Sequence, residues 1–99
     1  MIRIILYRHD QQYTGFCVSG HAGFAEAGRD IVCAAVSSAV EYSSVLLEKS
    51  DASYRPKVEE NRIEIRANNQ LVLESFHILM KAYSRQYPEY IRVTEVRYA

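Results

Sequence analysis

The stretch that decides the fold is residues 30–40, which reads DIVCAAVSSAV. It opens on Asp30, a residue type favoured at the N-cap of a helix, and no charged side chain follows before Glu41. Apolar residues recur beyond the cap at spacings of three and four, at Val32, Ala35, Ala39, Tyr42 and Leu46. The pattern therefore predicts a helix that begins after Asp30, ends at residues 49–51 and is buried nearly all round.

Two strands are predicted on the N-terminal side of this helix. In residues 2–7 apolar side chains alternate onto one face, which is typical of a half-buried strand. A second alternation covers residues 13–19, and the polar run 8–12 between them predicts the turn of a hairpin. Gly15, inside the second strand, indicates a β-bulge.

The C-terminal half contains a second hairpin, a second helix and one more strand. These elements are expected as strands at 55–60 and 62–67, a helix capped by Asn68 or Asn69 and ended by Pro88, and a strand at 91–98. The order ββαββαβ predicts an α+β fold: a two-layer sandwich in which two helices pack on a five-stranded, largely antiparallel sheet. A chain of 99 residues is expected to form a single domain over residues 1–99.

Charge and composition argue against several classes of protein. Twelve basic and twelve acidic side chains cancel, whereas a direct nucleic-acid binder needs a net basic surface. The uncharged apolar stretch at residues 31–40 is half the length of a membrane span, and the first residues lack the pattern of a secretory signal. We therefore expect a cytoplasmic protein that does not enter a membrane.

The two cysteines are expected to be free thiols, because nothing in the sequence indicates export to an oxidising compartment. The cysteines and histidines also lack the spacings of a zinc site. We expect neither a metal nor a cofactor.

The candidate for chemistry is the pair His21 and Cys33. Cys33 falls at the third position of the predicted helix, where unpaired backbone N–H groups and the positive end of the helix dipole favour a thiolate. An imidazole that takes the thiol proton would complete an activated nucleophile, and the same N–H groups could hold an oxyanion. The spacing is also compatible with Cys33 as an ordinary buried thiol, because the sequence does not show that His21 reaches it.

Other residues near the pair have structural explanations as well as functional ones. Asp30 is first a helix cap, with a secondary possibility of orienting His21. Ser37 lies one helical turn after Cys33 and could bond the thiol or fill a close contact. Between the pair lies a glycine-rich segment with Gly20, Gly23 and Gly28, which predicts a loop of unusual plasticity.

The elements Gly20-His21-Ala22-Gly23 and 28–37 (GRDIVCAAVS) resemble the ribosomal-processing cysteine protease (Prp) family of bacteria. The resemblance implies that His21 and Cys33 form a catalytic dyad, supported by Asp30 and Ser37, and that the loop 20–29 moves when substrate binds. It also implies a homodimer that removes the N-terminal extension of a large-subunit ribosomal protein by cutting after an aromatic pair. Because that extension is expected to be basic and hydrophobic, Glu26 is a candidate to attract it.

Three functional hypotheses follow from these observations. In the first, Cys33 attacks the scissile carbonyl, His21 protonates the leaving amine, and water hydrolyses the acyl-enzyme. In the second, the protein is a non-catalytic, ribosome-associated peptide-binding module whose glycine loop grips a peptide. The third is a redox sensor, which would need a disulfide between Cys33 and Cys17, a residue otherwise expected to be a packed thiol.

Overall fold

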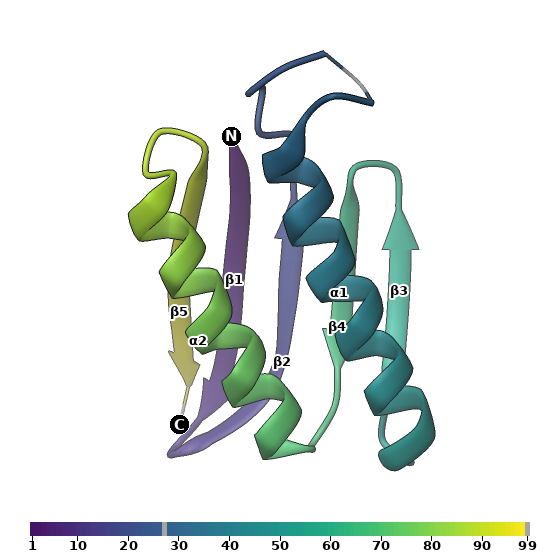
Figure 1. Cartoon of the computed structure of the whole chain (residues 1–99). Coiled ribbons are helices and arrows are strands. Elements are labelled where there is room, and N and C mark those ends of the chain that lie inside the picture. Colours follow the sequence, from purple (N-terminus) through teal and green to yellow (C-terminus); the bar gives the residue numbers. More distant parts are fainter. Residues whose placement is uncertain (27, 99) are drawn as a thin grey trace.

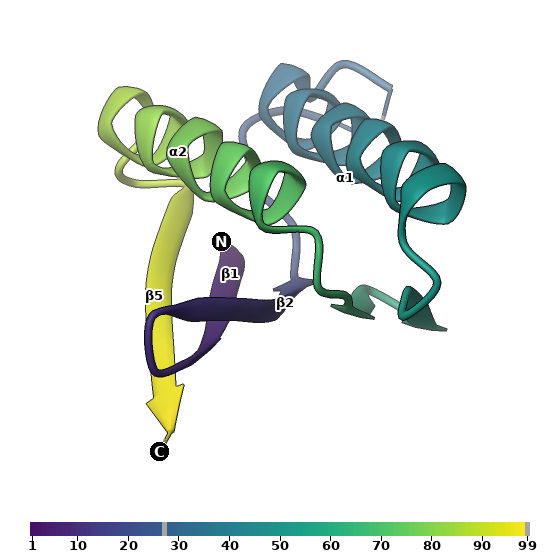
Figure 2. The ribbon, with the colours of Figure 1, turned by 90° about the horizontal axis from the view of Figure 1, so that it is seen from below.

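A mixed five-stranded sheet with both helices on one face forms the molecule (Figures 1 and 2). The computed structural model describes residues 1–26 and 28–98. The elements are β1 (Ile2–His9), β2 (Gln12–Ser19), α1 (Ile31–Ser50), β3 (Arg55–Glu59), β4 (Arg62–Arg66), α2 (Gln70–Gln86) and β5 (Ile91–Tyr98). The predicted α+β sandwich and its ββαββαβ order are confirmed.

The strands lie in the order β3-β4-β2-β1-β5. Three of the four pairings are antiparallel, and β5 runs parallel to β1 with Ile2 opposite Ile91. Parallel neighbours need a long crossover connection, which α2 supplies by carrying the chain from β4 across the sheet to β5 (Figure 1). The sheet is therefore largely antiparallel, as predicted.

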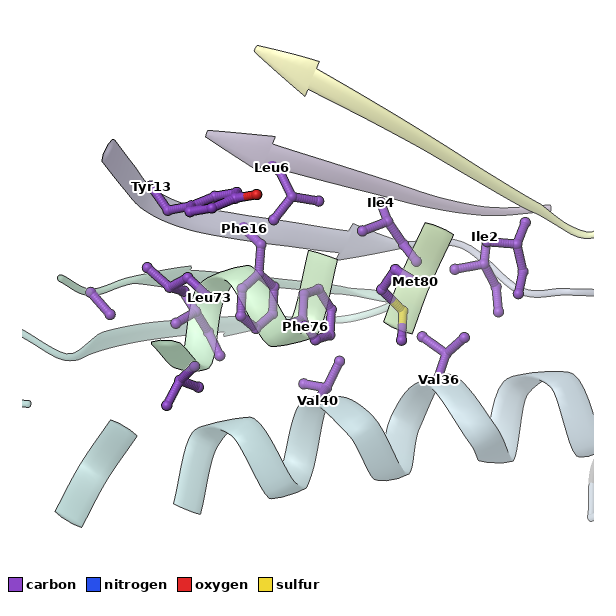
Figure 3. Close-up of a cluster of buried hydrophobic side chains, with 14 of the residues drawn as sticks. Ile2, Ile4, Leu6, Tyr13, Phe16, Val36, Val40, Leu73, Phe76 and Met80 are labelled. Carbon is purple, nitrogen blue, oxygen red and sulfur yellow. The ribbon is translucent and has the colours of Figure 1, made fainter. Parts of the chain in front are cut away.

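The core lies between the helices and one face of the sheet (Figure 3). Ile2, Ile4 and Leu6 alternate onto that face of β1, and each is almost fully buried. Phe16 of β2 stacks on Phe76 of α2, with ring centroids 3.9 Å apart. The side of α1 that meets this layer carries Val32, Val36, Val40, Ser43 and Leu47.

The prediction that α1 is buried nearly all round is wrong. Its outer side exposes large apolar residues, with Tyr42 68% and Val45 54% accessible. The sheet covers one side of the helix layer and no other element covers the opposite side within the described residues (Figure 2). The apolar side chains on that opposite side are therefore exposed. By length and composition α1 could also cross a membrane, with a mean hydropathy of 1.4 over an 18-residue window.

The first hairpin is tighter than predicted, because β1 continues through Arg8 and His9 and the turn is limited to residues 10–11. Arg8 remains in the strand because its backbone pairs with Tyr13 of β2 and with Arg97 of β5. Its side chain also has a partner, since Nη1 lies 3.0 Å from Glu95 Oε1 on β5. The predicted bulge is present as a register shift opposite Tyr7 and Arg8. Gly15 is required beside it, because a Cβ there would collide with the carbonyl oxygen of Ile65.

Asp51 ties the end of α1 to the start of α2. Its backbone N–H caps α1 by donating to the Leu47 carbonyl at 2.8 Å. Its carboxylate accepts hydrogen bonds from Ser53 and from the backbone amides of Asn68 at 2.6 Å and Asn69 at 2.7 Å. Burial alone would raise the pKa of the Asp51 carboxyl, but these hydrogen bonds outweigh it and lower the pKa to about 2.

Replacing Asp51 by asparagine is expected to destabilise the protein by roughly 1–3 kcal/mol at neutral pH, because bonds to a charged acceptor are lost. Folding lowers the pKa of the Asp51 carboxyl. Its contribution to the free energy of unfolding is therefore complete above the ordinary carboxyl pKa near 4 and is lost as pH falls towards 2. Urea unfolding at pH 6, 4 and 3 should show that the free energy of unfolding falls less with decreasing pH for Asp51→Asn than for wild type. Asp10→Asn, in an exposed turn, is the control; equal acid dependence in wild type and Asp51→Asn would contradict the assignment.

Candidate active site

One cavity of about 460 Å³ brings together the residues that the sequence singled out. It lies between the loop of residues 20–29 and the first turns of α1, at the upper end of the molecule in Figure 1. Its walls are His21, Gly23, Ala25, Gly28, Asp30, Cys33, Ala34 and Ser37. Every predicted site residue therefore lines the same space, except Gly20 and Glu26.

Cys33 occupies the predicted third position of α1, which begins directly after its N-cap Asp30. The side chain is half-buried at the cavity wall. Its Sγ accepts a hydrogen bond from the backbone N–H of Ala22, at 3.3 Å. Negative charge on this sulfur would thus lie against a backbone N–H and the positive end of a helix.

His21 follows a glycine that is fixed on two sides. Gly20 has a φ of 86°, its N–H donates to the Asn61 carbonyl at 3.1 Å, and a Cβ there would collide with the carbonyl oxygen of Met1. The start of the loop is thereby anchored to the sheet. The exposed imidazole of His21 lines the cavity with Cys33, and among the described residues no hydrogen bond joins its ring to the sulfur.

The rest of the loop is less constrained than its start. Gly23 and Gly28 have positive φ angles of 69° and 86°, and a Cβ at either would meet open space. The local backbone conformation favours glycine at both positions. Movement of this loop on substrate binding stays a prediction.

Asp30 organises the helix start and the loop together. One carboxylate oxygen accepts from the backbone amides of Val32 and Cys33, at 3.0 and 2.9 Å, and the other accepts from Phe24 at 3.2 Å. The bond from Cys33 is the main cause that lowers the pKa of the Asp30 carboxyl below its ordinary value, and the bond from Phe24 adds to it. Asp30 touches the backbone of Cys33 and the loop, whereas none of its hydrogen bonds among the described residues goes to His21.

This arrangement changes the expected oxyanion site. The N–H groups of Val32 and Cys33 donate to the Asp30 side chain, and that of Ala34 donates to the Asp30 carbonyl at 3.0 Å. These first-turn groups are therefore already used, contrary to the expectation that they would hold an oxyanion. The Ala22 N–H, which donates to Sγ, is the backbone donor that the structure places beside the sulfur.

Ser37 lies one turn beyond Cys33 on the same side of α1 and is exposed to the cavity. Within residues 1–26 and 28–98 it makes no side-chain hydrogen bond to Cys33, whose sulfur is bonded by Ala22 instead. A supporting role for Ser37 stays a prediction.

Phe24 is a residue that sequence reasoning missed. Its ring meets those of Tyr87 and Tyr90 edge-on, with centroids 5.9 and 5.2 Å away. These tyrosines follow α2, so the contact ties the loop to the far side of the helix layer. The two tyrosines lie more than sixty residues after Phe24, so no local sequence pattern links them to the loop.

Cys17 and His77 lie outside this cavity. Cys17 alternates with the core residue Phe16 on β2 and so faces the side of the sheet away from the helices, where burial raises the pKa of its thiol. A disulfide with Cys33 would have to pass through the sheet, so the redox hypothesis is wrong. His77 is buried against Tyr13, with Nδ1 2.7 Å from the phenol oxygen, and burial lowers the pKa of its imidazole.

Three kinds of comparison connect this geometry to known proteins. The family model described as cysteine protease Prp matches residues 1–92. The ribosomal processing cysteine protease Prp of Bacillus subtilis is 31% identical, over 95% of this chain and 96% of that protein. Its counterpart from Mycoplasma genitalium is 30% identical, over 80% and 85%.

Solved structures agree with these sequence matches. The ribosomal processing protease Prp of S. aureus, in complex with a covalently linked product peptide, superposes with a TM-score of 0.85 at 26% identity and covers 97% of this chain and 100% of that one. The same protease with a substrate peptide gives a TM-score of 0.80 at 25% identity, with the same coverage.

Proposed function

Because this chain belongs to the Prp family of cysteine proteases, we propose that Cys33 and His21 are its catalytic pair. The observation that carries the proposal is the shared cavity, in which a half-buried cysteine at a helix start and an exposed histidine line one space. A nucleophile beside a base, with access for a peptide, is what thiol proteolysis requires. The peptide-binding module without catalysis is set aside, because the family is one of proteases.

The mechanism follows from the residues around the sulfur. His21 takes the Cys33 proton as Sγ attacks the scissile carbonyl carbon, and the carbonyl π electrons move to its oxygen. The Ala22 N–H, 3.3 Å from Sγ, donates to that oxyanion in place of the first-turn amides that Asp30 occupies. His21 then protonates the leaving amine, and a water molecule, deprotonated by His21, hydrolyses the thioester and regenerates the thiol.

We propose that the substrate is the N-terminal extension of a large-subunit ribosomal protein, cut after an aromatic pair, in the cytoplasm. The curated relatives are named as ribosomal processing proteases, and the S. aureus structures hold a substrate peptide and a covalently linked product peptide. Loop 20–29, anchored at Gly20 and open at Gly23 and Gly28, supplies a segment that can close over an extended peptide.

The test is to incubate the wild-type protein with the large-subunit ribosomal proteins of its own organism and to follow their masses. The proposal expects one of them to lose a short N-terminal peptide, with a new N-terminus directly after two aromatic residues. If none of these proteins is shortened, the proposed substrate is wrong. Cleavage of other proteins in the same assay would keep the protease and reject this substrate.

We also propose that two copies associate through the outer face of the helix layer. That face exposes large apolar side chains, which a monomer rarely leaves uncovered in one patch; they are Tyr42, Val45, Leu46, Leu71, Ile78 and Leu79. A cavity of about 600 Å³ lies among residues of α1 and α2 on this side. A face of this kind fits a self-complementary dimer interface.

Replacing Leu71 by aspartate is expected to convert the dimer to a monomer in light scattering coupled to gel filtration. The side chain is 78% exposed and lies in the first turn of α2, so the acidic residue fits the monomer and opposes only the interface. Val58→Asp is the matched control, because Val58 is 74% exposed on β3, away from this face. A Leu71→Asp variant that remains dimeric would exclude this interface.

A further inference from the structure

A second groove lies along α1, next to the catalytic cavity. It has a volume of about 290 Å³ and lies between α1 and the β3–β4 hairpin. Its apolar surface is formed by Val18, Val36, Val40, Val58 and Ile63. We call this space the α1–hairpin groove.

The exposure of Val58 indicates that no other part of the described chain covers the α1–hairpin groove. Val58 pairs with Ile63 on β4. Ile63 lies two residues before the core residue Ile65, so both point to the helix-bearing face of the sheet, and the Val58 side chain lies on the same face. Most apolar residues on that face are buried, yet Val58 is 74% exposed. An apolar side chain from another molecule could therefore lie between Val58 and α1.

The groove adjoins the catalytic cavity. Ser37 lines both spaces, and Gly20, which precedes His21, lines the groove. Cys33, Ser37 and Glu41 follow one another at intervals of four residues, so they lie along one side of α1. A peptide held at Cys33 can extend along this line of residues.

Glu41 carries the negative charge of the groove that no described basic side chain pairs with. The other carboxylate, Glu59, is paired with Arg62 at 3.2 Å and lies 3.9 Å from Lys57. Among the described residues Glu41 forms no ion pair, and its side chain is exposed on the groove wall. A cation on the bound peptide would be its natural partner.

We propose that the α1–hairpin groove is the part of the substrate site that selects the peptide, taking an apolar side chain against Val58 and a lysine or arginine at Glu41. This rests on the proposed function, because the occupant is the peptide cut at Cys33. Eight residues of helix separate Cys33 from Glu41, about 12 Å at 1.5 Å per residue. An extended peptide advances about 3.3 Å per residue, so the cation lies about three to four positions from the scissile bond.

The first test measures kcat/KM for a peptide that copies the ribosomal-protein extension. Val58→Asp is expected to lower kcat/KM about ten-fold or more, because a carboxylate replaces the apolar contact. The control is Val96→Asp, the same change on the other edge strand, where Val96 is 42% exposed and outside the groove. This control should cleave like wild type.

The second test moves a single lysine through the peptide, from one to five positions on either side of the scissile bond. Wild type should prefer the lysine three or four positions away, and Glu41→Lys should lose that preference, by about five-fold in kcat/KM. Glu48→Lys, the same reversal on α1 outside the groove, should keep it. A position preference that survives in Glu41→Lys would overturn the assignment of Glu41.

A binding measurement separates failure of the groove from failure of the protease. Fluorescence anisotropy with the labelled peptide compares Cys33→Ala with the double variant Cys33→Ala/Val58→Asp. If wild type cleaves the peptide and Val58→Asp cleaves it equally well, the groove is wrong and the protease stands. If wild type does not cleave it, weaker binding by the double variant still supports the groove. Equal binding by both variants, or no binding by Cys33→Ala, overturns it.

Discussion

The Cys33→Ala variant is expected to lose peptide cleavage by about 10⁴-fold or more while keeping the fold of the wild type. In the proposed mechanism the Cys33 sulfur attacks the carbonyl. Among the described residues that line the cavity with His21, no other side chain carries a thiol that could replace it. Alanine retains the helix, and the half-buried side chain leaves little space when it is truncated. The measurement is kcat/KM on the extension peptide, with circular dichroism for the fold.

Two further variants separate the roles within the pair. Cys33→Ser should be nearly as inactive as Cys33→Ala, because a hydroxyl does not ionise near neutral pH as a thiol can. His21→Ala should also abolish cleavage, because the proton of the thiol then has no acceptor and the leaving amine no donor. Because His21 is exposed, its replacement is not expected to affect folding, so the loss of cleavage would reflect its role in catalysis.

Cys17→Ala is the matched control for the sulfur. Cys17 is buried on the other face of the sheet, where burial raises the pKa of its thiol, so cleavage should survive its removal. Iodoacetamide should add one carbamidomethyl group to wild type and to Cys17→Ala, at Cys33 in both. Full activity in Cys33→Ala, or loss of activity in a folded Cys17→Ala protein, would remove the dyad.

Replacing Phe16 by alanine is expected to cost about 3–5 kcal/mol of unfolding free energy. Phe16 has no exposed surface, and its ring stacks on Phe76 with an interplanar angle of 18°. Truncation removes the contact between β2 and α2 and leaves a cavity between the two layers of the sandwich (Figure 3). A small domain has a total stability of only about 5–15 kcal/mol, so the variant is expected to be partly unfolded at 37 °C.

Phe24→Ala is the control for this substitution. It removes the same number of atoms from a ring that is 40% exposed and packs edge-on against two tyrosines. Its cost should stay near 1 kcal/mol. Urea unfolding at 25 °C measures both variants, and a similar loss for Phe16→Ala and Phe24→Ala would show that the Phe16–Phe76 stack does not hold the layers together.

Much of the candidate site follows from local sequence. Asp30 before an uncharged apolar run predicts where α1 begins, and that start fixes Cys33 at the third helical position. The alternation in residues 2–7 predicts the buried face of β1 in the same way. Caps and alternation act over a few residues, because they satisfy backbone groups and bury side chains within one element.

Other features depend on residues that lie far apart in the chain. Asp30 occupies the amides of Val32, Cys33 and Ala34, and Ala22 reaches the sulfur only because the loop folds back over α1. Phe24 meets Tyr87 and Tyr90 across the helix layer. None of these partners is fixed by the spacing of the residues.

Short-range periodicity and capping are enough to predict the order of the elements, the start of α1 and the residues that could carry the chemistry. The folded arrangement was needed to show that α1 has an exposed apolar side, that Gly20 is held between Met1 and Asn61, and that Val58 is left uncovered. Which faces of the elements pack together depends on the whole arrangement of strands and helices, since a side chain is buried only when another element covers it.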